Sequence, residues 1–317
     1  MTTQPDMNPL GSTGLLVSPV TLGGGPLGSM PENFGYSVSE RDAVDLVRAV
    51  LDSGIRTIDT ANGYSQGRSE ERIGRAIAEH GGLPDDVLVI TKVDPQGKDY
   101  SGERVRRSLA ESSERLGIAP LPVVHLHDPE FHHFEVMTAP GGAVDALVAA
   151  RERGDVGHVG LAGGDVRQMA RYLDLGVFDL LLVHNRWTLV DRSAGELIAR
   201  ASEQGTAVLN AAVLGGGILA GASTTSTTYG YRPARPATLD AVARMREVCR
   251  AWGTDLAAAA IRFSTRDPRI SSTVVGISKT SRIGSTLAAA ALDLPEEFWE
   301  ELEALVPSPE NWLDAGA

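Results

Sequence analysis

The chain has 317 residues, of which 42% are hydrophobic and 22% are charged, so it can bury a large core and is not globally disordered. Acidic residues (41) outnumber Lys and Arg (29), and the net charge of −12 argues against a general binder of nucleic acids or anionic membranes. The single cysteine, Cys249, excludes an intrachain disulfide and a cysteine-based metal knuckle.

Short apolar runs alternate with longer amphipathic stretches through most of the chain. The runs are rich in β-branched residues, as is typical of strands buried on both faces. The predicted strands are Val20–Leu22, Ile55–Asp59, Val87–Thr91, Val123–Leu126, His158–Leu161, Leu180–Val183, Ala207–Leu209 and Thr273–Val275. The predicted helices are Arg41–Leu51, Gly102–Leu116, Ala143–Ala150, Val166–Leu173, Ala194–Ala201 and Leu239–Trp252, a helix through Leu287 and Ala291, and a short one with Phe298, Trp299, Leu302 and Leu305.

Eight strand–helix units predict a parallel (β/α)8 TIM barrel, formed by residues 1–317 as a single domain with a short N-terminal hairpin and a C-terminal helical tail. The competing architecture is an open doubly wound sheet. The glycine run at 23–25 is followed by Pro26 and Pro31 and not by a helical pattern, unlike the dinucleotide-binding turn of such a sheet, so it favours the barrel. The long Gly/Ser/Thr/Pro segment Leu214–Pro236 is predicted to be either disordered or functional.

The first residues carry no basic segment followed by an apolar stretch, and no run of 18 apolar residues occurs anywhere in the chain. We therefore expect neither a signal peptide nor a membrane span. The expected protein is soluble and cytoplasmic, a monomer or small homo-oligomer, with no nucleic-acid or membrane partner.

Polar side chains end three successive predicted strands. Asp59 ends the second strand and is soon followed by Tyr64, Lys92 ends the third, and His127 ends the fourth. Because chemistry in a barrel lies at the carboxyl ends of the strands, these side chains should converge at one mouth. An ammonium lowers the pKa of a neighbouring phenol, a carboxylate holds that ammonium, and a neutral imidazole orients a substrate oxygen. The set suits proton transfer at an oxygen whose carbon gains or loses hydride.

Three segments carry a resemblance to a known family. Residues 59–74 read DTANGYSQGRSEERIG, which resembles the signature of the aldo-keto reductases. Residues 90–93 (ITKV) and 125–129 (HLHDP) are similar to that family's next two active-site segments, and the resemblance runs from about Leu15 to Leu292. It implies a (β/α)8 barrel that uses NADPH or NADP, less often NAD. It also implies Tyr64 as general acid/base, Asp59 and Lys92 as its tuning pair, and His127 as the substrate-orienting group.

The same resemblance indicates where a nicotinamide cofactor binds. A helix N-terminus after the last strand is a natural phosphate site, which Ser278 would cap and to which Lys279 and Arg282 would add positive charge. This segment resembles the family's site for the adenosine 2′-phosphate, so NADP(H) is favoured and NAD(H) is possible. The glycine run after Leu214 resembles the family's loop over the pyrophosphate. The predicted cofactor-binding residues are Gly25, Pro26, Asp59, His184, Leu214, Gly215, Gly216, Gly217, Ser278, Lys279, Arg282 and Thr286.

Some positions depart from the family's pattern. Its Ser-Asn pair after strand 5 is Ala162-Gly163 here, its Gln at the end of strand 6 is His184, and its Tyr after strand 7 is Ala211. The stretches 210–212 (NAA) and 187–189 (WTL) are similar to the aldose 1-dehydrogenase branch (L-fucose, D-threo-aldose and galactose dehydrogenase types), which oxidises sugars. The resemblance thus implies hydride transfer between a nicotinamide and an aldose or carbonyl substrate. The predicted substrate residues are Tyr36, His127 and Trp187, with Phe34, Pro129 and parts of Leu214–Pro236.

Other interpretations remain open from the sequence. Asp59 could be a helix cap, Lys92 a solvated strand end, and His127 a hydrogen-bonded polar residue. His125, His127 and the pair at 132–133 could bind zinc in a metal-dependent barrel hydrolase, but its other ligands are not clearly placed, and we predict no metal. A non-catalytic barrel that senses NADP(H) is the other alternative, against which the complete four-residue set argues.

Overall fold

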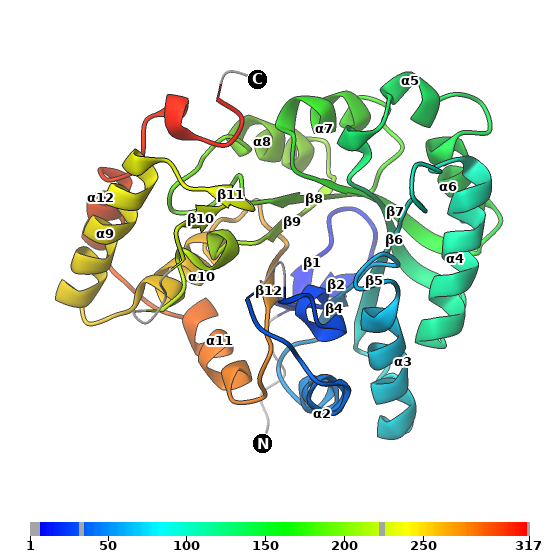
Figure 1. Cartoon of the computed structure of the whole chain (residues 1–317), viewed down its shortest axis with the longest axis horizontal. Helices are drawn as coiled ribbons and strands as arrows, with labels where there is room; N and C mark the ends of the chain where they lie inside the picture. Colours follow the sequence, from blue (N-terminus) through cyan, green and yellow to red (C-terminus); the bar gives the residue numbers. More distant parts are fainter. Residues whose placement is uncertain (1–6, 32–34, 222–225, 316–317) are drawn as a thin grey trace.

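The computed structural model describes residues 7–31, 35–221 and 226–315. Eight parallel strands close into a barrel in the order β12-β3-β4-β5-β6-β7-β8-β9, with helices around them (Figure 1). The barrel strands are β3 (Val20–Gly23), β4 (Thr57–Asp59), β5 (Leu88–Val93), β6 (Leu121–His127), β7 (Val156–Gly163), β8 (Leu180–His184), β9 (Ala207–Ala211) and β12 (Ser272–Gly276). All eight predicted strands and the predicted barrel are confirmed, so the carboxyl ends of β4, β5 and β6 lie side by side.

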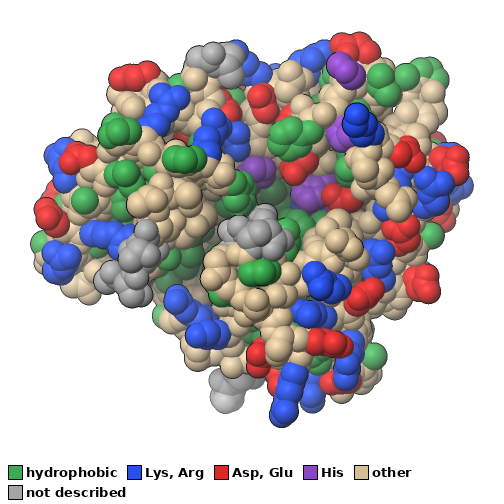
Figure 2. All heavy atoms as spheres, in the orientation of Figure 1, with side chains coloured by type: hydrophobic (Ala, Val, Ile, Leu, Met, Phe, Trp, Pro, Cys, Tyr) green, Lys and Arg blue, Asp and Glu red, His purple; other side chains and the backbone are tan. Residues whose placement is uncertain are grey.

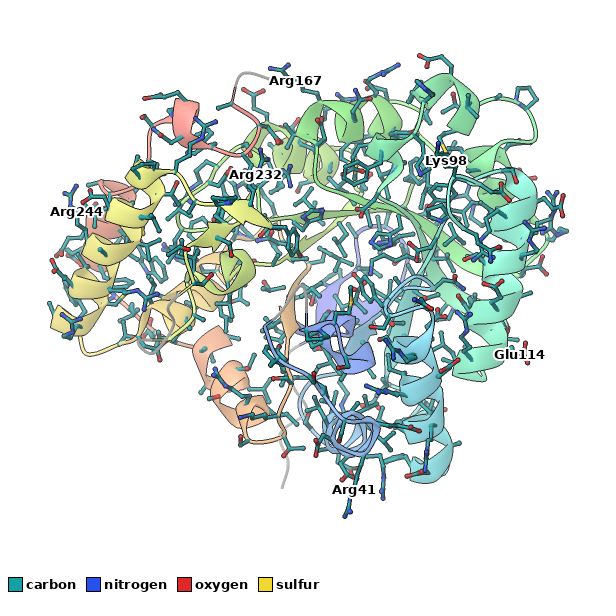
Figure 3. The ribbon with its side chains drawn as sticks, in the orientation of Figure 1. Arg41, Lys98, Glu114, Arg167, Arg232 and Arg244 are labelled. Carbon is teal, nitrogen blue, oxygen red and sulfur yellow. The ribbon has the colours of Figure 1, made fainter. Side chains whose placement is uncertain are left out.

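Helices return the chain between the strands and cover the barrel's outer face. They are α2 (Glu40–Leu51), α3 (Arg68–His80), α4 (Gly102–Leu116), α5 (Phe134–Met137), α6 (Ala143–Glu152), α7 (Val166–Leu173), α8 (Gly195–Glu203), α9 (Pro236–Ala251), α10 (Leu256–Thr265), α11 (Arg282–Ala290) and α12 (Glu296–Glu303). Single turns of 3₁₀ helix are η1 (Gly25–Gly28), η2 (Pro129–Phe131), η3 (Gly215–Gly217) and η4 (Pro309–Asn311). Charged side chains project from the helices around the rim, where Arg41, Glu114 and Arg244 are labelled (Figure 3).

Three helices, α3, α5 and α10, are not among those predicted from amphipathic patterns, and α5 is a single four-residue turn. In α10 the sequence LAAAAIRFST has little polar contrast along most of its length, so its buried face does not stand out. In α3 the buried residues Ile73, Ala76 and Ile77 do have helical spacing, and the polar residues Ser69 and Glu70 share their buried side. Packing against neighbouring elements stabilises both helices: α3 contacts α2 and α4, and α10 contacts α11 and β12.

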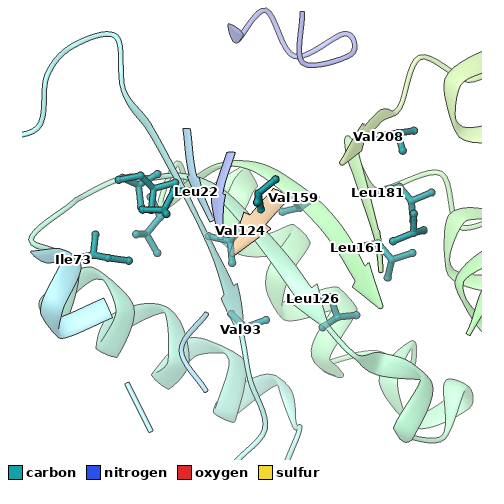
Figure 4. Close-up of a cluster of buried hydrophobic side chains, with 14 of the residues drawn as sticks. Leu22, Ile73, Val93, Val124, Leu126, Val159, Leu161, Leu181 and Val208 are labelled. Carbon is teal, nitrogen blue, oxygen red and sulfur yellow. The ribbon is translucent and has the colours of Figure 1, made fainter. Parts of the chain in front are cut away.

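Side chains alternate along the strands between two buried layers. Residues such as Val93, Val124, Leu161 and Leu181 face the helices and form the larger core (Figure 4). The residues next to them along the strands, such as Ile90 and Val123, point the other way and fill the barrel's interior. Because successive residues of a strand point to opposite faces, Lys92 and His127 fall on the interior side at the open end.

The predicted N-terminal hairpin is formed by β1 (Asn8–Pro9) and β2 (Leu16–Val17). Leu10 and Val17 are fully buried and belong to the interior layer of the barrel. The backbone N–H of Ser12 donates to the carbonyl of Gly205, just before β9. The hairpin therefore closes the amino-terminal end of the barrel and leaves the carboxyl end for the site.

The long segment after β9 carries secondary structure of its own. It contains η3 and a second hairpin, β10 (Thr228–Tyr229) paired with β11 (Arg232–Pro233). The predicted C-terminal helix is α12, whose Phe298 and Leu302 pack in a separate core with α9, α10 and Tyr229. Within the described residues, no helix is both long and apolar enough to cross a lipid bilayer.

Candidate active site

Asp59, Tyr64 and Lys92 come together at the carboxyl ends of β4 and β5. The Lys92 ammonium lies 2.7 Å from Asp59 Oδ2, 2.7 Å from the Thr60 carbonyl and 3.3 Å from the Tyr64 hydroxyl. Lys92 is 1% exposed and Asp59 is 2% exposed. Burial therefore excludes a solvated strand end for Lys92, and the Asp59 carboxylate is engaged by Lys92.

The turn after β4 brings Tyr64 back over the mouth. The backbone N–H of Asn62 donates to the Lys92 carbonyl at 3.1 Å, which holds the turn against β5. A Cβ atom at Gly63 would lie 2.8 Å from Asp94 Cγ, so only glycine fits there. The sequence ANGY thus folds tightly enough to place the phenol beside the ammonium.

His127 completes the set from the end of β6. Its ring meets the Tyr64 ring edge-to-face, with centroids 5.6 Å apart. Its backbone N–H donates to the Tyr100 hydroxyl at 2.9 Å, and that hydroxyl donates to the Val93 carbonyl at 2.7 Å. Figure 2 shows a hollow near the centre of this face with histidine side chains on its wall. The four residues that the sequence placed at one mouth do lie together.

The charge state of Tyr64 differs from the expectation. Burial raises the pKa of Tyr64 well above its usual value, and the negative charge of Asp59 and the other nearby acidic groups adds to the increase. The Lys92 ammonium does not reverse this direction, because Asp59 and the Thr60 carbonyl already hold it closer. A raised pKa keeps the Tyr64 phenol neutral at neutral pH, where it is a proton donor.

His127 is the more readily charged member of the set. Burial lowers the pKa of His127, but the carboxylates of Asp94 and Asp128 outweigh it, and the net direction is upward. Burial likewise raises the pKa of Asp59 in spite of Lys92. Proton gain and loss at this mouth therefore involve the imidazole as well as the phenol.

Two acidic groups at the site did not emerge from the sequence as candidates. Asp94 lies just after β5, and its Oδ1 is 2.7 Å from His127 Nδ1. Asp128 Oδ2 lies 3.9 Å from His127 Nε2, and its Oδ1 lies 3.8 Å from His184 Nε2. Each directly follows a strand end, which is the signal that could have identified both.

The histidines of the zinc alternative do not converge. His125 is fully buried inside the barrel, and neither of its ring nitrogens has a hydrogen-bond partner among the described residues. The His132 ring instead packs edge-to-face on Tyr100, with centroids 5.0 Å apart. In the described part of the chain, neither His125 nor His132 belongs to a cluster of His, Cys, Asp and Glu at ligand spacing.

The proposed phosphate site lies after β12, with one correction. Ser278 does not cap the helix, because α11 begins at Arg282 with Ser281 as its N-cap, and Ser281 makes no capping side-chain bond. A turn intervenes, in which the Arg282 N–H donates to the Lys279 carbonyl at 3.0 Å. Lys279 and Arg282 are exposed, the first turn of α11 has no acidic residue, and Thr286 is buried one turn later. The cations and the uncapped helix start fit an anionic phosphate.

The first and last barrel strands adjoin this site. Gly23 pairs with Gly276 across β3 and β12, and a Cβ at Gly276 would lie 3.3 Å from Pro26 in η1. Gly25 begins η1 beside Pro26. Glycines at the ends of β3 and β12 therefore let the backbones of β3, β12 and η1 approach one another closely, next to the start of α11.

The glycine run after β9 owes its composition to backbone geometry. Gly215, Gly216 and Gly217 have φ of 60°, 74° and 103°, a left-handed conformation that other residues rarely adopt. A Cβ at Gly216 would meet nothing within 4 Å, whereas one at Gly215 would strike the Tyr229 ring. The glycines after Leu214 are therefore required by the turn, and Gly216 is open to a ligand.

One departure from the family's pattern, Gly163, has a structural explanation in Glu130. A Cβ at Gly163 would lie 2.4 Å from Glu130 Oε2, so the glutamate occupies the space of a side chain at this position. The Gly164 N–H donates to the other oxygen of Glu130 at 2.5 Å. His184 ends β8 and pairs in register with Ala211 of β9. The ends of β6, β7 and β8 thus carry an alternative set of polar groups.

The predicted substrate residues lie in different places. The Trp187 indole N–H donates to Asp267 at 3.0 Å, its ring packs against Phe263, and Arg192 lies over the ring, so the indole is engaged by packing and hydrogen-bond contacts within the protein. Tyr36 is 41% exposed, and Phe34 lies outside the described residues. These substrate roles stay predictions.

Tyr231, from the turn between β10 and β11, is a further aromatic group at the mouth. It is 59% exposed, its ring centroid lies 6.4 Å from that of His184, and its φ is 65°. A bulky residue in that backbone region is strained, and such strain gathers at functional sites. The sequence placed Tyr231 only within the broad segment Leu214–Pro236.

Comparisons with known proteins agree with this geometry. The model of the "Aldo/keto reductase family" matches residues 19–307. An L-galactose dehydrogenase from Arabidopsis thaliana is 30% identical over 318 residues, covering 98% of this chain and 97% of the relative. A D-threo-aldose 1-dehydrogenase from Pseudomonas sp is 30% identical over 307 residues, covering 87% of this chain and 92% of that one.

Solved structures share the fold. The holo form of an aldo-keto reductase from Bacillus halodurans superposes with a TM-score of 0.79, over 96% of this chain and 97% of its own. Its sequence is 20% identical to this chain, so the likeness concerns the barrel architecture.

Proposed function

This chain belongs to the aldo/keto reductase family and is an NAD(P)-dependent oxidoreductase, and from that premise we propose that it transfers hydride between the nicotinamide and an aldose, oxidised at C1, or a carbonyl substrate, with Tyr64 as general acid/base. The observation that carries this assignment is the Tyr64 hydroxyl 3.3 Å from the Lys92 ammonium, beside His127. The similarity to two aldose dehydrogenases and the NAA stretch at 210–212 support the sugar substrate.

The residues present fit a phosphorylated nicotinamide cofactor. Lys279 and Arg282, at the start of α11, would hold its charged adenosine end, and Gly216 would lie against its pyrophosphate. When bound, the cofactor supplies the acceptor or donor of the hydride. The 2′-phosphate is the part of NADP that a pair of cations recognises, and NADP(H) is the proposed preference.

The chain's own residues handle the proton and the substrate oxygen. In reduction, the neutral Tyr64 phenol donates its proton to the oxygen of the carbonyl. In oxidation, Tyr64 must first lose its proton, Lys92 stabilises the phenolate, and Asp59 holds Lys92 in place. His127 orients the same oxygen from the other side of the mouth.

The raised pKa of Tyr64 predicts different pH dependences for the two directions. A group with a raised pKa keeps its proton at neutral pH, so the acid form needed for reduction is fully present there. The base form appears only as pH rises, so kcat/KM for aldose oxidation should increase from neutral to alkaline pH while aldehyde reduction stays high near neutrality. Initial rates in both directions, with circular dichroism as a check on folding, measure this. An oxidation rate that is flat over the range in which the protein stays folded would contradict the assignment.

Cofactor preference tests the phosphate site. The double variant Lys279→Ala/Arg282→Ala should raise the Kd for NADP on the order of 10-fold or more, because each lost charge-assisted contact is worth about 1.5–3 kcal/mol. The Kd for NAD should change little. Isothermal titration with both cofactors gives the comparison, and Arg41→Ala, at an exposed arginine of α2, is the control. Equal losses for NAD and NADP would remove these two residues from the 2′-phosphate site.

The substrate itself is found by a screen of aldoses and small aldehydes with NAD and NADP, followed by the absorbance of the reduced nicotinamide. Turnover of aldoses supports the proposal, and a preference for simple aldehydes would move the assignment to carbonyl reduction. Cofactor binding with no turnover over the whole panel would favour the regulatory barrel instead.

A further inference from the structure

Asp94 joins two parts of the active site. It follows Val93, the last residue of β5, and is 9% exposed. One carboxylate oxygen, Oδ1, lies 2.7 Å from His127 Nδ1, and the other, Oδ2, accepts the Gly63 N–H at 2.6 Å. Gly63 directly precedes Tyr64, so a single carboxylate contacts both the imidazole and the turn that carries the phenol.

The backbone of Asp94 is fixed from α4. Its N–H donates to Ser108 Oγ at 3.2 Å, and its carbonyl accepts from Arg104 Nε at 2.9 Å. Arg104 is itself held by Glu111 and by the Asn62 side chain, each at 2.8 Å. The residue is therefore anchored on a rigid element, which is how a group that orients another must be held.

The contact with Asp94 determines which ring nitrogen of His127 carries a proton. An ionised carboxylate can only accept hydrogen bonds, so Nδ1 must be the donor, and the neutral imidazole is the Nδ1–H tautomer. Among the described residues, Nε2 has no direct protein partner within hydrogen-bond reach, since its neighbour Asp128 Oδ2 is 3.9 Å away. Nε2 is therefore the atom available to a substrate oxygen.

We propose that Asp94 is a positioning residue of this enzyme: it fixes His127 as the Nδ1–H tautomer with Nε2 free for the substrate oxygen, and it ties that imidazole to the Tyr64 turn through Gly63. The inference rests on the proposed function, because it assigns Asp94 a role only if His127 meets the substrate.

The charges around His127 come from several strands. Asp94 faces Nδ1, Asp128 lies near Nε2, and His184 pairs with Asp128 from β8. The other titratable groups near the imidazole are Asp59, Tyr64, Lys92 and His125, together with Tyr100, whose hydroxyl bonds the His127 backbone. Lys92 lowers the pKa of His127, so the two carboxylates are what keep it raised. Removal of the Asp94 charge should therefore move the imidazole pKa downward.

The test is Asp94→Asn, which keeps the side-chain shape and an acceptor for Gly63 but loses the charge. We expect kcat/KM to fall about 10- to 100-fold, a part of the usual contribution of a general acid/base group, with cofactor Kd unchanged. The limb of the pH profile that reports His127 should shift to lower pH. The matched control is Asp52→Asn, which removes the partner of the surface residue His80, 3.1 Å away, and should leave the kinetics unchanged.

A direct measurement does not depend on any variant. In wild-type protein labelled with ¹⁵N-histidine, the neutral His127 ring should be protonated at Nδ1, and Asp94→Asn should lower its pKa or admit the Nε2–H tautomer. A wild-type ring protonated at Nε2 would overturn the inference.

A double-mutant cycle separates positioning of His127 from a structural effect on the Tyr64 turn. In a His127→Gln background, Asp94→Asn should cost little further kcat/KM, because its effect passes through the imidazole. The same penalty in both backgrounds would place the effect in the Gly63 turn and overturn the inference. A Tyr64→Phe variant with normal turnover would instead overturn the proposed function, so the two failures are distinguishable.

Discussion

Replacement of Tyr64 by Phe is expected to lower kcat on the order of 100-fold or more in both directions, while cofactor affinity stays near that of the wild type. The change removes only the hydroxyl that lies 3.3 Å from the Lys92 ammonium. Because the ring remains, its edge-to-face contact with His127 is retained. The loss should therefore appear in turnover, measured by steady-state kinetics, with cofactor Kd measured in parallel.

The matched control for this variant is Tyr172→Phe. Tyr172 is another buried tyrosine, fully enclosed in the outer core, and its hydroxyl lies 3.5 Å from the Pro129 carbonyl. Its loss should leave kcat near the wild-type value. Near-normal turnover by Tyr64→Phe would remove the phenol from the reaction, and the proposed chemistry would have to be abandoned.

Replacement of Lys92 by Met should abolish most turnover and also destabilise the protein. Lys92 and Asp59 form a buried pair at 2.7 Å, and removal of one partner leaves the other charge without compensation. Breaking a buried pair of this kind costs about 3–5 kcal/mol. Denaturant unfolding measures the loss of stability, and the rate assay measures the loss of turnover.

The pH dependence of the stability loss and a second substitution test the same ion pair further. Burial raises the pKa of Asp59, so in the variant the carboxyl can take up a proton, and the penalty should shrink as pH falls. Lys92→Met/Asp59→Asn should recover much of the stability but none of the turnover. Lys98→Met, at the exposed lysine labelled in Figure 3, is the control. Full stability of Lys92→Met near neutral pH would mean that the pair does not act as a buried ion pair.

The positions of the catalytic set followed from the sequence because they depend on periodicity. A β-branched run that ends in a polar residue marks the carboxyl end of a strand, and parallel strands bring such ends together. Asp59, Lys92 and His127 all satisfy that rule. Their proximity is therefore a property of the repeated strand–helix unit and requires no knowledge of the side-chain contacts.

Other parts of the site depend on contacts that no local pattern encodes. The pKa of Tyr64 is set by burial and by carboxylates at the ends of three different strands, which a single neighbouring ammonium does not predict. Asp94 gains its role from His127, 33 residues away along the chain. Ser278 looks like a helix cap by composition, but a turn through Lys279 displaces the helix start to Arg282.

The barrel closes where β12, the last strand, pairs with β3, the first barrel strand, and this affects when during synthesis the protein can catalyse hydride transfer. All four acid–base residues lie between 59 and 127, and a growing polypeptide contains them early. The groups proposed to hold the cofactor come later in the chain, Gly216 after β9 and Lys279 and Arg282 after β12. A chain that still lacks β12 and α11 has its proton-transfer residues but not the two cations proposed to anchor a dinucleotide, so hydride chemistry requires that β12 and α11 be made and paired.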